Sequence, residues 1–241
     1  MLGAAACAAA LMATPVADAS PFQVDSTSTA EDVELKSVFE HRDSSSKQTW
    51  IAPKLALAFP VAERLEFEVA TEYRKVERDG VAQEGFGDSS LELKWRVVDE
   101  TPQGVAVAMV PELSLPTGSE SRGLGSGHAE LVVPVVVEKR LGRVTLSGEL
   151  GYGHSFEDGD GDVIPLGLLV TTQPSDTLKV GMEIAGEAPA DHFSDCELNT
   201  NVGFKWKATR NLEIHGLVGR TVRSPDSDPT TRFKLVAEVR L

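Results

Sequence analysis

Hydrophobic and polar residues alternate with a period of two along most of the chain. Leu65, Phe67 and Val69 fall on one face of their segment, and Glu66 and Glu68 fall on the other. Because successive side chains of a strand point to opposite sides, this alternation predicts strands with one apolar and one polar face. About twelve such strands are predicted, over Val33–Phe39, Trp50–Phe59, Leu65–Tyr73, Asp88–Val97, Gly104–Leu115, Glu130–Arg140, Val144–Phe156, Val163–Thr172, Thr177–Gly186, Leu198–Trp206, Leu212–Arg220 and Thr231–Leu241.

The connections between these strands alternate between short and long. The short ones are Pro60–Arg64, Asp99–Gln103, Leu141–Arg143, Pro174–Asp176 and Ala208–Asn211. The long ones are Glu40–Thr49, Lys75–Gly87, Pro116–Ala129, Glu157–Asp162, Glu187–Glu197 and Thr221–Thr230. Outer-membrane barrels have short periplasmic turns and long outer loops. The pattern therefore predicts an all-β fold, a closed antiparallel up-and-down transmembrane β-barrel with both chain ends on the short-turn side.

Most aromatic residues fall near the two ends of the predicted strands. Those near the loop end are Phe39, Trp50, Tyr73, Phe86, Tyr152, Phe156, Phe193 and Phe233, and those near the turn end are Phe59, Phe67, Trp95, Phe204 and Trp206. Amphipathic rings favour the two interfaces of a bilayer, so two girdles are expected. Pro53, Pro111, Pro134 and Pro165 fall inside strands and predict bulges there, because proline removes a ladder donor.

If the apolar face meets lipid, the other face lines the interior with about equal numbers of acids and bases. Neighbouring opposite charges either fill a narrow lumen with ion pairs or line a conducting path of little charge selectivity, and the sequence leaves both interpretations open. The residues predicted to line the lumen are Glu66, Glu68, Arg74, Glu92, Lys94, Arg96 and Lys205.

Composition narrows the possible partners and the division of the chain. With 37 acidic and 23 basic residues the formal net charge is −14, which argues against binding nucleic acid. The apolar, Ala-rich N-terminus ending in Ala17-Asp18-Ala19 predicts a secretory signal peptide over residues 1–19, with a gene start upstream of Met1 because no basic residue precedes it. A periplasmic leader over residues 20–32 and the barrel over residues 33–241 follow. Cys7 and Cys196 are too few for a structural zinc site.

No arrangement typical of catalysis emerges. His154 and Ser155 are adjacent on a strand and point to opposite faces, whereas Ser126 and His128 lie in a Gly-rich loop without a placed acid. His215 is expected to face inward alone. The acidic run Glu157–Asp162 has neither a glycine nor a distant glutamate at the positions that the spacing of an EF-hand requires. The sequence therefore predicts no enzyme, no catalytic residue, no cofactor and no metal site.

Several short motifs resemble a known family. Gly85-Phe86-Gly87-Asp88, Leu115-Pro116-Thr117-Gly118-Ser119, Gly123-Leu124-Gly125-Ser126-Gly127 and Gly151-Tyr152 are similar in order and spacing to outer-membrane transporters of the "MetA-pathway of phenol degradation" family, over roughly residues 85–241. The resemblance implies a Gram-negative outer-membrane β-barrel that passes small compounds, with aromatic or hydrophobic ones proposed. Such barrels end in an aromatic residue recognised by the barrel-assembly machinery, whereas this chain ends in Leu241.

The leading hypothesis is a porin-like channel or transporter of the bacterial outer membrane that passes small solutes passively. Its expected partners are membrane lipid and lipopolysaccharide, a small-molecule solute, and the barrel-assembly machinery during biogenesis, without nucleic acid. The alternatives are an outer-membrane lipid-modifying enzyme and a soluble periplasmic β protein.

Overall fold

Each predicted alternating segment forms a strand in the computed structural model, which describes residues 20–157, 161–225 and 228–241. Ten strands run without interruption, namely β1 (Glu34–Asp43), β2 (Lys47–Ala62), β3 (Leu65–Arg78), β8 (Glu130–Leu141), β9 (Val144–Ser155), β10 (Val163–Ser175), β11 (Leu178–Pro189), β12 (Glu197–Lys207), β13 (Leu212–Arg223) and β14 (Thr231–Arg240). The predicted signal peptide and residues 158–160 of the acidic loop lie outside the described residues.

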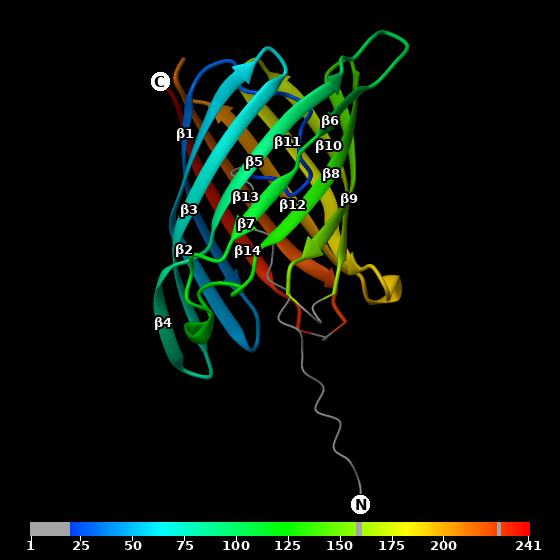
Figure 1. Cartoon of the computed structure of the whole chain (residues 1–241). Coiled ribbons are helices and arrows are strands. Elements are labelled where there is room, and N and C mark those ends of the chain that lie inside the picture. Colours follow the sequence, from blue (N-terminus) through cyan, green and yellow to red (C-terminus); the bar gives the residue numbers. More distant parts are fainter. Residues whose placement is uncertain (1–19, 158–160, 226–227) are drawn as a thin grey trace, which may run out of the picture.

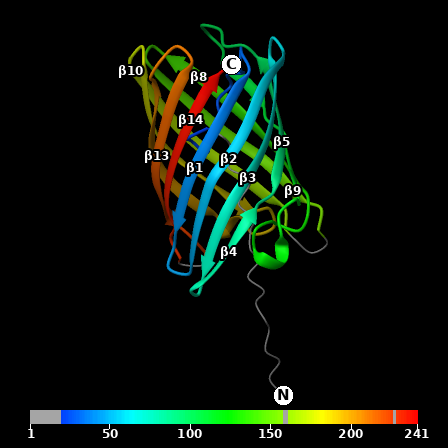
Figure 2. The same cartoon turned by 90° about the vertical axis from the view of Figure 1, so that its left-hand side faces the viewer.

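Two further barrel strands are each divided into two parts. β4 (Val81–Phe86) and β5 (Ser89–Val98) pair with successive parts of β3, and β6 (Ala106–Met109) and β7 (Glu112–Leu115) pair with successive parts of β8. All neighbours are antiparallel, and β1 pairs with β14 along its whole length, which closes the ring (Figures 1 and 2). The predicted closed barrel of twelve antiparallel strands is confirmed.

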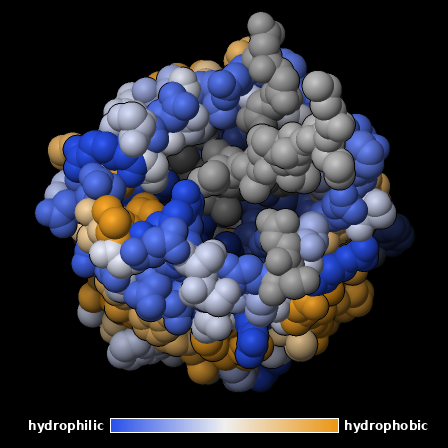
Figure 3. Space-filling model, turned by 90° about the horizontal axis from the view of Figure 1, so that it is seen from below, coloured by the Kyte–Doolittle hydropathy of each residue, from blue (hydrophilic) through white to orange (hydrophobic). Residues whose placement is uncertain are grey.

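The two faces of the sheet have opposite polarity. Near the middle of their strands Leu150, Leu168 and Met182 are about 60% exposed on the outside, whereas Lys54 and Glu72 are almost fully buried on the inside. Seen from the loop end, hydrophilic residues surround a central hollow and hydrophobic residues lie toward the outer side (Figure 3). This is the reverse of a water-soluble core. Among the described residues, no helix has the length and apolar character that crossing a membrane requires.

The two ends of the barrel differ as predicted, although two of the predicted long loops are mostly strand. β1 begins and β14 ends at the turn end (top in Figure 1). At the loop end, the predicted loop 40–49 shrinks to three residues between β1 and β2, and the predicted loop 75–87 is a hairpin extension of β3 and β4. Asp79 and Gly80 both have positive φ (52° and 76°), which suits a two-residue hairpin turn and explains why the strands continue.

The longer loops contain short 3-10 helices. η1 (Glu120–Arg122) lies between β7 and β8, and η2 (Phe193–Asp195) lies between β11 and β12.

All four prolines lie at interruptions of the ladder, but only Pro53 lies at a shift of register. The register shifts around Pro53, and Pro111 lies in the break between β6 and β7. Pro134 and Pro165 keep a regular register, because Gly151 lies between them on β9. A Cβ at Gly151 would lie only 2.8 Å from the Pro134 Cα and 2.9 Å from the Pro165 Cγ, so the glycine leaves room for both rings.

Aromatic rings pair on the outer surface near both ends of the barrel. Near the loop end Phe39 contacts Phe233, with ring centroids 6.3 Å apart, and Tyr73 contacts Phe86 at 5.7 Å. Near the turn end Phe59 contacts Phe67 at 5.4 Å. These pairs occupy the heights at which the two girdles were predicted.

Candidate functional site

The barrel interior is the candidate site, because the charged faces of all the strands meet there. Of the residues predicted to line the lumen, Glu66, Glu68, Glu92 and Lys94 are buried, and Arg74, Arg96 and Lys205 are partly exposed. The Glu68 carboxylate accepts a hydrogen bond from Lys36 Nζ at 2.9 Å. The structure brings Glu66, Lys94 and Lys205 to the wall of one cavity.

Arg74 and Arg96 lie apart from that cavity. Arg74 Nε donates to Glu72 at 2.5 Å in the loop half of β3. Arg96 Nε lies 3.2 Å from an Asp99 oxygen, at the turn end of β5. The seven predicted residues therefore do not form a single cluster.

The segment that precedes β1 runs inside the barrel. Residues 20–32 form an irregular coil within the ring of strands (dark blue in Figure 1), and Pro21, Phe22, Val24, Asp25 and Thr27 are buried. This placement differs from the periplasmic leader that the sequence analysis expected. We call residues 20–32 the inner segment.

Glutamates of three strands hold the inner segment by its backbone. Glu183 on β11 accepts hydrogen bonds from the amides of Gln23 (2.9 Å) and Val24 (3.0 Å). Glu149 on β9 accepts from the Asp25 amide at 2.8 Å, and Glu66 on β3 accepts from the Ala30 amide at 2.6 Å. Charged acceptors make such bonds stronger than neutral ones, so the segment is anchored firmly to three strands.

Side chains of the inner segment add an ion pair and an apolar contact. Lys94 Nζ lies 2.8 Å from Asp25 Oδ1, and both groups are almost fully buried. Phe22 and Val24 pack with Leu169, Ala185 and Leu217, which are apolar residues on the inner face.

Three inward-facing glycines make the groove that receives this apolar pair. A Cβ on Gly181 or Gly203 would lie about 3 Å from the Phe22 ring, and a Cβ on Gly167 would lie 2.4 Å from Val24. The strand wall therefore fits the segment closely. The feature of the sequence that could have indicated this contact is the occurrence of glycines and leucines at inward-facing strand positions.

The inner segment lies between two cavities. The turn-side cavity has a volume of about 450 Å³ and a mostly charged wall. The loop-side cavity is smaller, about 130 Å³, and its wall includes Val110, Val132, Pro134, Pro165 and Leu166. Phe22 and Asp25 border both cavities, so the segment narrows the path from one end of the barrel to the other.

Sequence reasoning missed two charged groups of the interior. Glu40, assigned to a loop, is buried on β1, where Arg42 Nε (2.5 Å) and Arg232 Nε (3.3 Å) contact its Oε1. His215, expected to face inward alone, lies near the carboxylates of Glu213 and Glu238. Both groupings depend on strand extension or cross-strand register, which the alternation does not reveal.

At the loop end, one acid joins two connections. Asp228 accepts hydrogen bonds from the hydroxyls of Ser46 (2.6 Å) and Ser45 (2.7 Å). These hydrogen bonds hold the pKa of Asp228 well below its usual range, and the one from Ser46 has the largest effect.

Three of the four motifs that carry the family resemblance meet in one place at the loop end. Asp88 accepts hydrogen bonds from the amide of Gly118 (2.8 Å) and from the amide and hydroxyl of Ser126 (2.7 and 2.9 Å). The Ser126 hydroxyl oxygen also lies 2.7 Å from the His128 carbonyl oxygen, a second acceptor for its one hydrogen, and the His128 ring contacts Glu157. Ser126 thus fixes a loop, and its hydroxyl is directed away from the neighbouring imidazole.

Replacing Asp88 by alanine is expected to release the loop over residues 116–129. The change leaves two backbone amides and a hydroxyl without their acceptor, which costs about 1–3 kcal/mol of local stability. Limited proteolysis of the folded barrel should then cut within this loop, whereas the wild-type loop resists. Asp228→Ala is the matched control, because it removes an acid of another loop-end connection. Equal cleavage of the wild type and the Asp88 variant would contradict this role.

Comparison with known proteins gives matches in structure but not in sequence. No protein-family model and no curated protein matches the chain. The COG4313 outer membrane channel from Pseudomonas putida F1 superposes with a TM-score of 0.75 over 90% of this chain and 98% of that chain, at 14% identity. The chain therefore shares the closed β-barrel fold of that protein.

Two porins are similar to a lesser degree. The NanC porin has a TM-score of 0.62 over 86% of this chain and 100% of its own, at 8% identity. The KdgM porin has a TM-score of 0.59 over 86% of this chain and 99% of its own, at 11% identity. The fold implied by the family resemblance is thereby confirmed, and membership of that family stays a prediction.

Proposed function

We propose that this protein is a passive channel of the bacterial outer membrane for small solutes. The observation that carries the proposal is the inverted barrel, with an apolar outer face and charged walls around two internal cavities. A charged interior of this size is costly to bury dry, and water-filled lumens are typical of outer-membrane barrels. The similar structures are outer-membrane channels and porins, which supports the same conclusion.

We further propose that small aromatic or amphipathic compounds are among the solutes. The support is the loop-side cavity, whose apolar wall lies opposite charged residues such as Arg42 and Arg232. Its volume of about 130 Å³ is comparable to the cavity of about 150 Å³ that accepts benzene in another protein. Acids such as Glu92 and Glu112 line the cavity as well, so an aromatic ring with one polar or charged group would contact both an apolar and a charged part of the wall.

Planar-bilayer recording of the purified, detergent-folded barrel tests the channel. Discrete conductance steps in salt solution are expected, of small size because the inner segment narrows the path. A boiled and an unboiled sample on an SDS gel establish that the barrel used is folded. A bilayer that remains sealed at all voltages would remove the channel proposal and leave the fold intact.

Val132→Thr is expected to slow entry of an aromatic acid. The replacement keeps the volume but puts a hydroxyl on the apolar wall of the loop-side cavity, so uptake of benzoate by proteoliposomes should fall a few-fold. Uptake of a small sugar, which does not need that wall, should stay the same. Val135→Thr is the matched control, because Val135 is exposed on the outer face. Unchanged benzoate uptake in the Val132 variant would count against aromatic solutes.

A further inference from the structure

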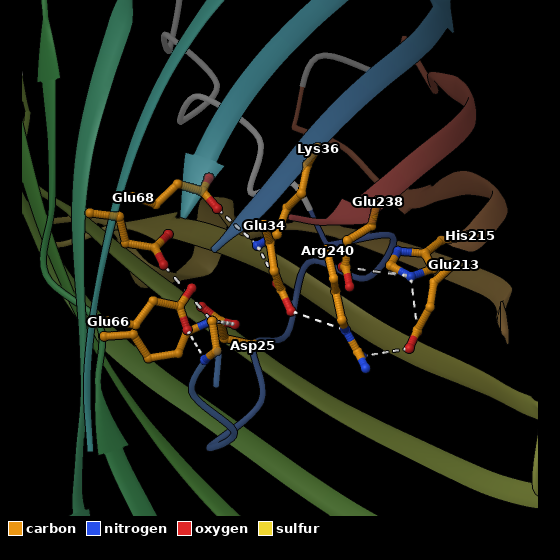
Figure 4. A network of polar contacts seen from close by, with 12 residues as sticks. Asp25, Glu34, Lys36, Glu66, Glu68, Glu213, His215, Glu238 and Arg240 are labelled. Atoms are coloured by element: carbon orange, nitrogen blue, oxygen red, sulfur yellow. Dashed lines mark hydrogen bonds and ion pairs between the residues drawn. The ribbon is translucent and has the colours of Figure 1, made fainter. Parts of the chain in front are cut away.

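Three titratable side chains converge on the inner wall at the turn end of the barrel. Glu213 and His215 lie two residues apart on β13 and therefore share a face, and Glu238 is the register partner of Glu213 on β14. His215 Nε2 lies 3.5 Å from Glu213 Oε2 and 3.9 Å from Glu238 Oε2. Figure 4 shows the imidazole directed toward both carboxylates.

The imidazole is buried without a hydrogen bond. The His215 side chain is 1% exposed, and neither of its ring nitrogens has a hydrogen-bond partner within the described part of the chain. Buried polar atoms are normally satisfied, because an unsatisfied one costs about 1–3 kcal/mol. In addition, like charges directly opposite on neighbouring strands repel, as the carboxylates of Glu213 and Glu238 do. A cation held by all three groups would satisfy the imidazole and would add to the neutralisation that Arg240 provides at Glu213.

The spacing of the three groups matches the coordination shell of a small metal ion. Tetrahedral zinc has ligand atoms at about 2.0–2.2 Å, which places those atoms about 3.3–3.6 Å from one another. One oxygen of each carboxylate and one ring nitrogen lie within 4.8 Å of one another here, so side-chain movements of about 1 Å would bring them to the spacing of that shell. We propose that Glu213, His215 and Glu238 form a zinc site.

The surroundings leave the proposed ligand atoms available. Arg240 Nη2 binds Glu213 Oε1 at 2.8 Å, and Lys207 Nζ lies 3.8 Å from that same oxygen. These bases orient the carboxylate, and Oε2 stays turned toward His215. An outer group that fixes a metal-binding carboxylate in this way is typical of protein metal sites.

The turn-side cavity leaves room for water at the fourth coordination position of the proposed zinc ion. Glu213 and Glu238 line this cavity, and their side chains are only about 11–12% exposed. Three protein ligands with one position open to water are the arrangement of many zinc sites, and a nitrogen ligand favours zinc over calcium, which prefers oxygen. The site departs from the sequence-based expectation of no metal, and it does not depend on solute conduction.

Isothermal titration of the folded barrel in detergent with Zn²⁺ tests the proposal. The wild type should bind one ion, and His215→Gln and Glu238→Gln should each weaken binding by about 100-fold or more, because each removes a ligand. Co²⁺ offers a second readout, since its visible absorption bands in a tetrahedral nitrogen and oxygen shell should appear with the wild type and vanish in both variants.

His154→Ala is the matched control, because His154 is an exposed imidazole 2.7 Å from an acid, Asp162, at the loop end. This variant should bind Zn²⁺ as the wild type does. The heat-dependent shift on an SDS gel identifies the variants that fold. If His215→Gln does not fold, the comparison of Glu238→Gln with the wild type still tests the proposal. Failure of the wild type to bind, or equal binding by the wild type and the folded variants of the site, would overturn the proposal.

Discussion

Deleting residues 20–30 is expected to raise the single-channel conductance several-fold. The deletion removes Phe22 and Asp25, which border both cavities, and joins the turn-side and loop-side spaces into one path. The strands do not depend on the inner segment for their ladder, so the ring should still close. Recording in planar bilayers at one salt concentration gives the comparison directly.

A control must separate loss of the obstruction from a general loosening of the barrel. Ser28→Gly with Thr29→Gly changes the inner segment at an exposed and a half-buried residue, and this pair should leave the conductance near the wild-type value. Phe22→Ala with Val24→Ala should give an intermediate conductance, because the groove contact is lost and the backbone hydrogen bonds remain. Equal conductance of the deletion variant and the wild type would show that the ions follow another route.

Leu168→Arg is expected to destabilise the membrane-embedded barrel by about 2–4 kcal/mol, the cost of a basic side chain on the lipid face near the bilayer midplane. Leu168 lies near the middle of β10 and is 64% exposed on the outside. Urea unfolding in lipid vesicles measures the free energy of unfolding.

Leu141→Arg is the depth-matched counterpart of this variant. Leu141 is also exposed, but it ends β8 beside a turn, so the same substitution should cost only about 0–1 kcal/mol. Equal costs at the two positions would mean that the outer face does not meet hydrocarbon.

The strands could be predicted from sequence because their signal is local. Alternation along β3, where Phe67 faces out and Glu66 and Glu68 face in, depends only on the geometry of one extended chain. The same rule gives the number of strands, the faces and the two ends of the barrel. It fails at Asp79-Gly80, where a hairpin turn extends β3 into a stretch whose polar composition resembles a loop.

The candidate site was only partly predictable, because it depends on contacts between distant segments. The inner segment has no periodicity, and its place in the barrel follows from carboxylates such as Glu183, some 160 residues later. His215 looked isolated because its nearness to Glu238 depends on the register between β13 and β14. The sequence therefore indicates which single residues face inward, but only the folded barrel shows which of them lie together.

The way in which the inner segment is held sets which sequence changes it tolerates. Its anchors at Gln23, Val24, Asp25 and Ala30 are peptide amides donating to wall carboxylates, and nineteen of the twenty amino acids carry such an amide. Most substitutions at Gln23 and Ala30 would thus leave these backbone hydrogen bonds intact. Proline, which has no amide hydrogen, is the single replacement that would detach the backbone there.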